Sequence, residues 1–226
     1  RKKYDLILLG YSLNELLEEE SEDSNYSQML FSLPGLLKNN GMAIITEPAQ
    51  NDLCHLLQKK CAELVDGHQI INLHGPYFNG MSCPLAMNQS KYFSHEVRKF
   101  KPSETVEKIN RPLNLEIREV KFGLSMMGTA HPRELDKENQ VCRIISPLKK
   151  RKGTVSFIGM ATDGNEYTYE FQRRDLQKEE LNDLMKLTRG DIIEFPGINV
   201  NETEDRVRLQ KIEQVKPLFM PRLCTK

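Results

Sequence analysis

Short apolar runs alternate with amphipathic segments in the first third of the chain. The runs Tyr4–Gly10, Met42–Glu47 and His68–Leu73 are typical of buried strands. Between them, Asn25–Lys38 and Asp52–Val65 carry leucines at helical spacing. Strands that alternate with helices through short connections predict an α/β fold whose neighbouring strands run parallel.

The middle of the chain lacks a clear period. Gly75–Pro84 is rich in Gly, Pro and aromatic residues, and Lys91–Lys101 is basic with interleaved aromatics. Leu113–Phe122 alternates well enough to predict a strand. We therefore expect a first domain over residues 1–140 with an irregular insertion at about 74–112.

From Val141 onward the pattern becomes all-β. The expected strands are Val141–Ile145, Thr154–Met160, Glu166–Phe171, Asp191–Phe195 and Arg206–Val215. One helical segment, Lys178–Leu187, falls between the third and fourth of them. Five strands with a helix after the third are the order of an OB-type barrel, so residues 141–226 predict an OB-like β-barrel domain.

The charge balance, the apolar runs and the cysteines limit the classes of partner and the compartment that this chain can have. The 226 residues include 32 basic and 32 acidic side chains, so contact with nucleic acid must come from a local patch. No apolar run is long enough to span a bilayer, and no secretory signal is visible, so we expect no membrane partner. Five scattered cysteines favour a reducing intracellular compartment. The first residue is Arg1, not Met, which indicates part of a longer protein.

Two strand ends are candidates for ligand binding, because ligands of open α/β sheets bind beyond the carboxyl ends of the strands. One is the turn of Gly10, Tyr11 and Ser12, and the other begins at Glu47. Ser12 followed by Glu15 predicts a capping box that opens a helix. If the two strands are parallel neighbours, these residues should meet at one edge of the sheet. The alternative is a pair of ordinary strand-to-helix turns.

Established nucleotide and hydrolase motifs are absent from the sequence. It contains no glycine-rich G-x-G-x-x-G loop, P-loop, H-E-x-x-H or G-x-S-x-G segment. His74 with Cys83 could form part of a metal corner, but one Cys and one His without a second pair are a weak signal. We therefore expect no metal.

Two basic stretches are candidates for RNA contact. Four cations bunch between two expected strands of the barrel, where they suit phosphate, the alternative being a solvated hairpin tip. A second stretch lies beside Tyr92 and Phe93, which could stack on bases or simply pack in the core. The candidate residues are Lys149, Lys150, Arg151 and Lys152 in the first stretch, and Arg98, Lys99 and Lys101 in the second.

Several segments, taken in order, resemble the methyltransferase-like proteins of the small ribosomal subunit, the Rsm-twenty-two type known from yeast mitochondria and many bacteria. The similar segments are Tyr4–Leu16, Gly41–Pro48, Cys83–Leu85, Tyr92–Ser94, Pro147–Gly153, Thr162–Gly164 and Gly190–Asp191. The resemblance implies a partial Rossmann-type methyltransferase sheet followed by an OB-like barrel. It also implies S-adenosylmethionine as the ligand, near Gly10, Tyr11, Ser12 and Glu47.

The same resemblance implies small-subunit ribosomal RNA and ribosome assembly intermediates as partners, in the bacterial cytoplasm or the mitochondrial matrix. The main S-adenosylmethionine loop of the family would lie upstream of Arg1. Of the four cysteines that hold an iron–sulfur cluster in some family members, only Cys83 aligns, so we expect no cluster. Two alternatives stay open: a non-catalytic RNA-binding module on a degenerate methyltransferase scaffold, and an enzyme that methylates a small molecule.

Overall fold

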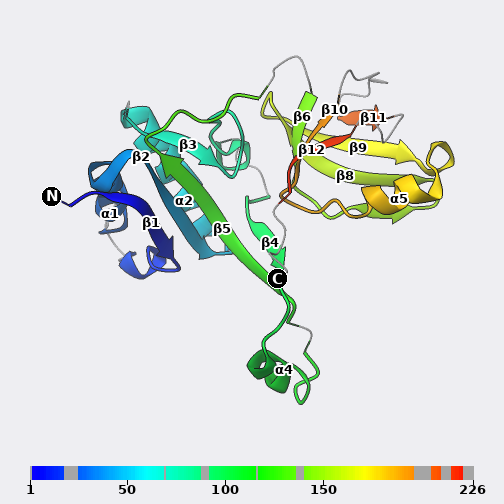
Figure 1. Ribbon diagram of the computed structural model, residues 1–226, viewed down its shortest axis with the longest axis horizontal. Helices are drawn as coiled ribbons and strands as arrows, with labels where there is room; N and C mark the ends of the chain where they lie inside the picture. Colours follow the sequence, from blue (N-terminus) through cyan, green and yellow to red (C-terminus); the bar gives the residue numbers. More distant parts are fainter. Residues whose placement is uncertain are drawn as a thin grey trace. The chain divides into compact units, whose positions relative to one another are not determined.

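The computed structural model describes residues 2–17, 25–68, 70–87, 92–115, 117–135, 140–195, 205–209 and 215–220. It is a mixed α/β fold with two sheets (Figure 1). The contacts divide it into two compact units, the first from residues up to Arg133 and the second within Glu134–Pro221. No helix of the part described here is long and apolar enough to cross a bilayer.

The first unit is built on a sheet with the strand order β1-β2-β5-β3, and β4 also pairs with β5. Its strands are β1 (Tyr4–Gly10), β2 (Leu37–Pro48), β3 (Asn72–Gly75), β4 (Glu96–Lys99) and β5 (Glu119–Gly128). The expected parallel pairing of β1 with β2 is confirmed, with Leu8 opposite Ile44.

The expectation of parallel neighbours fails at the third strand. β5 lies between β2 and β3 and runs antiparallel to both, with Ile44 opposite Met126. The expected strand Leu113–Phe122 was placed too early, because the residues before Glu119 leave the sheet. The third strand also begins at Asn72, later than the predicted start at His68.

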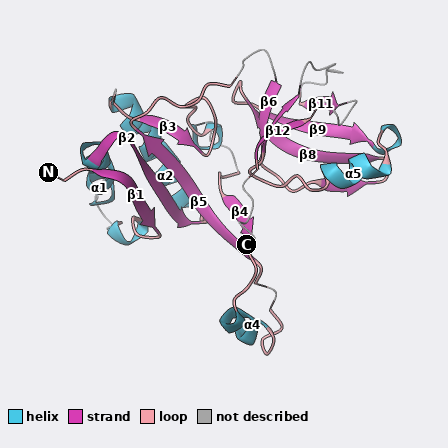
Figure 2. Ribbon diagram, viewed as in Figure 1, coloured by secondary structure: helices cyan, strands magenta, loops and turns pink. Residues whose placement is uncertain are grey.

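Two helices cover one face of this sheet (Figures 1 and 2). They are α1 (Asn25–Leu36) and α2 (Asn51–Gly67), and they contact each other as well as β2. Leu30 of α1, Leu57 of α2 and Ile45 of β2 are each fully buried in one core cluster. The apolar spacing that predicts both helices is therefore the spacing that forms this core.

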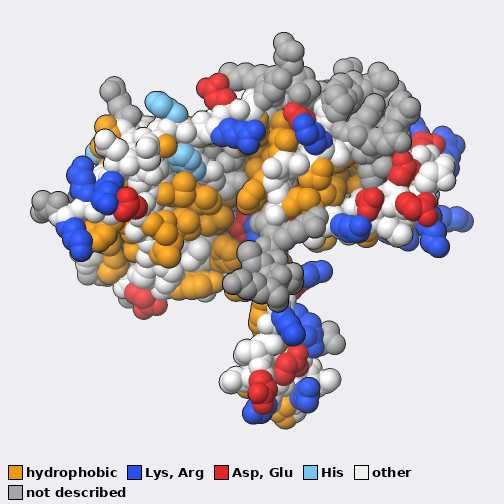
Figure 3. All heavy atoms as spheres, in the orientation of Figure 1, with side chains coloured by type: hydrophobic (Ala, Val, Ile, Leu, Met, Phe, Trp, Pro, Cys, Tyr) orange, Lys and Arg blue, Asp and Glu red, His pale blue; other side chains and the backbone are white. Residues whose placement is uncertain are grey.

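The other face of the sheet keeps apolar side chains partly open to water. Leu6 and Leu8 of β1 are 51% and 66% exposed, and they lie opposite Met42 and Ile44 of β2. Figure 3 shows apolar side chains gathered over this sheet. β1 is also the edge strand, so one side of its backbone has no partner strand among the residues that the structure describes.

Between β4 and β5 the chain leaves the sheet and forms an arm, which we define as residues 100–118. The arm contains helix α4 (Glu104–Asn110), which stands clear of the sheet in Figure 1. It is joined at its base, where the Phe100 N–H donates to the Arg118 carbonyl at 3.0 Å. The short helix α3 (Pro84–Met87) lies earlier in the same insertion.

The second unit is a strongly curled sheet, a half-barrel with the order β11-β9-β8-β6-β10-β12 and with β7 on β8. Its strands are β6 (Gln140–Ile144), β7 (Lys149–Arg151), β8 (Thr154–Ala161), β9 (Glu166–Gln172), β10 (Ile192–Phe195), β11 (Arg206–Leu209) and β12 (Lys216–Phe219). Helix α5 (Lys178–Leu184) lies between β9 and β10, as the sequence predicts. All pairs are antiparallel except β11 with β9.

Two details of this unit differ from expectation. The predicted strand Arg206–Val215 is shorter, ending at Leu209, and residues 210–214 lie outside the described part. The basic run, expected as a loop, forms strand β7 instead, because its backbone pairs with β8 from Thr154 to Ser156.

An aromatic cluster forms the core of the second unit. The Phe157 and Tyr169 rings stack with centroids 5.3 Å apart, and Phe195 lies 5.1 Å from Tyr169. Gly159 faces this cluster: a Cβ there would lie 2.7 Å from the Tyr169 ring and 2.8 Å from the Cys142 Sγ. Only glycine fits at this position without displacing neighbours.

Candidate ligand and RNA sites

The ends of β1 and β2 meet, as predicted. Gly10 lies opposite Thr46, and the Tyr11 N–H donates to the Thr46 carbonyl at 2.8 Å. Glu47 follows directly and contacts the loop after Tyr11. The expected juxtaposition of Tyr11, Ser12 and Glu47 at one edge of the sheet is therefore confirmed.

Glu47 holds the loop that follows β1. Its carboxylate is 0% exposed and accepts from the Leu13 N–H at 3.1 Å and the Asn14 N–H at 3.2 Å. These two N–H groups begin the 3₁₀ helix η1 (Asn14–Leu16), so Glu47 caps it from another strand.

The predicted capping box of Ser12 with Glu15 is wrong. The N-cap residue of η1 is Leu13, which makes no side-chain cap, and only a single 3₁₀ turn forms where a helix was expected. The carboxylate of Glu47, from another strand, instead accepts from the first two N–H groups of the turn, those of Leu13 and Asn14.

Burial governs the charge of Glu47. Desolvation raises the pKa of the carboxyl above its ordinary value, and the backbone N–H groups of the loop oppose that rise. The buried phenol of Tyr26 lies in the same neighbourhood, and desolvation, with Cys61 and Glu47 as smaller causes, raises its pKa as well. Both groups therefore hold their protons more tightly than they would in water.

Tyr11 is the exposed aromatic of this loop. Its backbone is left-handed, with φ at +52°, which is rare for a bulky residue and stores strain. The side chain is 45% exposed, and the hydroxyl donates to the Lys121 carbonyl at a long 3.5 Å. An exposed ring at the end of a strand is well placed to stack on a planar ligand.

The strain at Tyr11 is measurable through two substitutions. Tyr11→Gly and Tyr11→Ala both remove the ring, but only glycine accepts a positive φ without a steric penalty. We expect the Gly variant to be the more stable by about 1 kcal/mol in urea unfolding followed by circular dichroism. Equal stability of the two variants would contradict a left-handed Tyr11 in solution.

The four residues do not by themselves make a cradle for S-adenosylmethionine. A Cβ at Gly10 would meet only the Thr46 Oγ1, at an ordinary 3.6 Å, so no close backbone approach is required there. Both carboxylate oxygens of Glu47 serve the loop. Tyr11 and Ser12 alone present exposed side chains toward a ligand.

The basic run forms one strand of a β-hairpin in the second unit. Lys149 and Arg151 pair with Ser156 and Thr154, whereas Lys150 pairs with the buried Val155. Side chains alternate along a strand, so Lys149 and Arg151 share one face and Lys150 lies on the other. Lys152 belongs to the turn that joins β7 to β8, and all four cations are exposed.

A fifth cation joins this hairpin, and sequence reasoning missed it. The Arg173 N–H donates to the Gly153 carbonyl at 2.8 Å, so the exposed Arg173 follows β9 directly beside the hairpin tip. Antiparallel pairing of Thr154 with Gln172 produces this neighbourhood. Antiparallel pairing of the expected strands Thr154–Met160 and Glu166–Phe171 would have placed Arg173 beside Gly153 already from the sequence. We call Lys149–Lys152 with Arg173 the basic hairpin.

The other basic stretch is split by its contacts. Arg98 pairs with the buried Glu96 and donates to the Val97 carbonyl at 3.0 Å, so its guanidinium serves strand β4. Lys99 and Lys101 are exposed. The half-buried Phe93 ring lies 4.6 Å from the His95 ring, and Tyr92 is exposed.

The cysteines are buried thiols wherever the structure describes them. Cys54, Cys61, Cys83 and Cys142 are buried, and Cys224 lies outside the described residues. Burial raises the pKa of Cys54 to about 11 and that of Cys61 to about 12, which makes both thiols poor nucleophiles. No group of three potential metal ligands occurs within the ranges described.

Comparison of the sequence with protein-family models and with curated proteins found no match.

Proposed function

We propose that this chain binds small-subunit ribosomal RNA as part of a methyltransferase-like ribosome assembly factor. The observation that carries the proposal is the basic hairpin. Five exposed cations gather at one hairpin of a curled sheet, in a chain whose net charge is zero. Local positive charge on a β scaffold suits the phosphates of RNA.

The strand pairings support the scaffolds implied by the resemblance. In the first unit, a single reversed strand, β5, lies near one end of a sheet whose other main strands share one direction, as in Rossmann-type methyltransferase sheets. In the second unit, β11 and β12 are successive strands at opposite ends of the strand path. That arrangement, with α5 after the third long strand, supports an OB-like barrel, a scaffold that binds oligonucleotides.

A second version of the proposal omits methyl transfer, and one observation favours it. Glu47 is the one carboxylate among the four cofactor candidates at the strand ends. Both of its oxygens accept hydrogen bonds from the backbone of the loop. Holding the loop after β1 therefore explains the presence of Glu47 without a bound cofactor. Under this version the first unit is a scaffold for RNA binding, and S-adenosylmethionine has no role in affinity.

The test replaces Lys149, Lys150, Arg151 and Lys152 by Ala in one variant. We expect weaker binding to a fragment of small-subunit ribosomal RNA, with the slope of log affinity against log salt falling by about two to three units. Each lost phosphate contact lowers the slope by about 0.7 on single strands, and the two faces of the hairpin need not all engage. The measurement is a fluorescence anisotropy titration at several salt concentrations.

Controls separate charge from folding and from position. Lys149→Ala with Arg151→Ala removes one face of the hairpin and Lys150→Ala the other, so a slope change confined to one of these variants identifies the face that meets RNA. Melting should be nearly unchanged, because exposed charge changes alter stability by less than about 0.5 kcal/mol each. Parallel salt lines and equal affinity would assign the run to a solvated hairpin. Absence of salt-dependent RNA binding in the wild type would favour an enzyme with a small-molecule substrate.

A further inference from the structure

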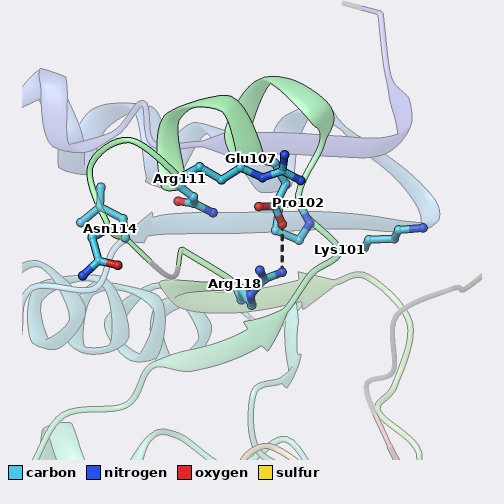
Figure 4. Close-up of a pocket in the computed structure, with 8 residues that line it drawn as sticks. Lys101, Pro102, Glu107, Arg111, Asn114 and Arg118 are labelled. Atoms are coloured by element: carbon cyan, nitrogen blue, oxygen red, sulfur yellow. Dashed lines mark ion pairs between the residues drawn. The ribbon is translucent and has the colours of Figure 1, made fainter.

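The arm that leaves the first sheet carries an open cavity of about 480 Å³. The cavity is lined by Lys101, Pro102, Glu107, Asn110, Arg111, Asn114, Leu115 and Arg118. Figure 4 shows Glu107, Arg111 and Arg118 close together beside α4, with Lys101 and Asn114 at opposite ends of the pocket. The volume lies in the range of small-ligand sites, so a single nucleotide unit would fit.

The walls of the cavity are fixed by hydrogen bonds within the arm. Asn110 is 2% exposed, and its amide donates to the Ile117 carbonyl at 3.3 Å and accepts from the Ile117 N–H at 3.4 Å. The Leu115 N–H donates to the Asn110 carbonyl at 2.8 Å, and Asn114 adopts a left-handed φ of +51°. The loop after α4 is therefore folded back in a defined shape.

The lining carries an excess of positive charge. Its lining includes three cations and one carboxylate, and that carboxylate is already paired, because Arg118 Nη1 lies 3.0 Å from Glu107 Oε1 (Figure 4). No ion pair is found for Lys101 or Arg111 among the residues that the structure describes. The cavity therefore offers one ammonium group and one guanidinium fork to an anion.

The rest of the lining suits a nucleotide. The exposed amide of Asn114 can supply hydrogen bonds, and Pro102 and Leu115 supply an apolar wall for a sugar or a base. Lys99 adds an exposed cation on the strand that enters the arm. A phosphodiester with an attached nucleoside uses all of these groups, whereas an isolated small anion would leave the apolar wall without a contact.

We infer that the arm is a second RNA-binding element, which holds a phosphodiester of single-stranded RNA between Lys101 and Arg111. This inference rests on the proposed function and adds a site to it. Sequence reasoning identified Lys101 but missed Arg111 and Arg118, because those two come together with it only through the fold of the arm.

The test is the double variant Lys101→Ala with Arg111→Ala in the full chain. The probe is a fluorescent oligouridylate of about 12 nucleotides, a length within the reach of such surfaces. We expect affinity to fall about tenfold, and the salt slope to fall by about 1.4 for two lost phosphate contacts on a single strand. Arg111→Lys keeps the charge but loses the fork, so it should lose part of the affinity and keep the slope.

A matched control lies on the same helix. Lys108→Ala removes an exposed cation that pairs with Glu104 at 2.8 Å and does not line the cavity, so it should bind like the wild type. A double variant equal to the wild type in affinity and slope would overturn the inference and leave the proposed function standing. A wild type without RNA affinity would overturn both.

One further experiment distinguishes RNA from an acidic protein as the occupant of the cavity. A polyglutamate peptide should displace the oligouridylate only weakly, because it lacks bases and phosphates. Displacement by polyglutamate as effective as by unlabelled oligouridylate, and lost in the double variant, would assign the cavity to an acidic protein segment and overturn the inference.

Discussion

Replacing Glu47 by Ala should destabilise the first unit by about 2 to 3 kcal/mol. The substitution removes the acceptor of two backbone N–H groups, those of Leu13 and Asn14, and Leu13 itself is buried. A hydrogen bond to a charged group contributes about 1.5 to 3 kcal/mol, and an unsatisfied buried N–H adds a desolvation penalty. The chain has no Trp, so urea unfolding is best followed by circular dichroism.

Amide hydrogen exchange locates the effect. The Leu13 and Asn14 amides should lose protection before the strands of the sheet do, because only the loop depends directly on the carboxylate. Unchanged protection of these two amides in the Ala variant would contradict the capping role of Glu47.

The conservative variant Glu47→Gln tests the charge, and the sign follows from the raised pKa. Because the folded chain holds the Glu47 proton more tightly than the unfolded chain, whose pKa is close to the ordinary 4.5, this group favours folding at low pH. That contribution is present below 4.5 and is lost as the pH rises through the folded-state pKa. The wild type should therefore gain stability relative to the Gln variant as the pH falls. A difference that moves the other way would contradict the burial of an ionisable Glu47.

Gly159→Ala should destabilise the second unit by about 2 to 3 kcal/mol. The added methyl would overlap both the Tyr169 ring and the Cys142 Sγ, and the ring is locked by Phe157 and Phe195 on either side. Overpacking a dense core forces side chains from their rotamers. The measurement is urea unfolding, with exchange of the β8 and β9 amides to assign the loss to this unit.

Two comparisons make the Gly159 result specific. Gly35 lies inside helix α1, and a Cβ there would meet nothing within 4 Å, so Gly35→Ala should stabilise by about 0.5 to 1 kcal/mol. Adding Cys142→Ala to Gly159→Ala removes one of the two overlaps, so the double variant should lose less than the sum of the singles. Additive losses would mean that the methyl is accommodated elsewhere.

Local patterns predicted the elements better than their partners. The amphipathic segment of α2 has a period that burial on one face explains, whereas the run Tyr4–Gly10, predicted as a buried strand, forms a strand without a fully buried residue. The position of β5 between β2 and β3 could not be read in this way, because an alternating strand carries no mark of its neighbours. The charge run at Lys149 concealed a strand for a related reason: its backbone pairs with β8 whatever its side chains are.

The candidate sites show the same limit. Glu47 was found because it ends a strand, but its role depends on contacts with residues 34 and 33 positions earlier in the chain. The sequence does not mark Arg111 and Arg118 as site residues. They line the same cavity as Lys101 because Asn110 and the left-handed Asn114 fold the loop after α4. Such contacts over a distance in sequence depend on the whole fold, which no spacing rule contains.

The apolar side chains left open on β1 bear on how the isolated chain is handled. Leu6 and Leu8 lie on an edge strand without Pro, a residue by which natural edges avoid pairing with other molecules. Concentrated preparations should therefore associate through the first unit, and crystallisation or spectroscopy will benefit from additives that coat aliphatic surface.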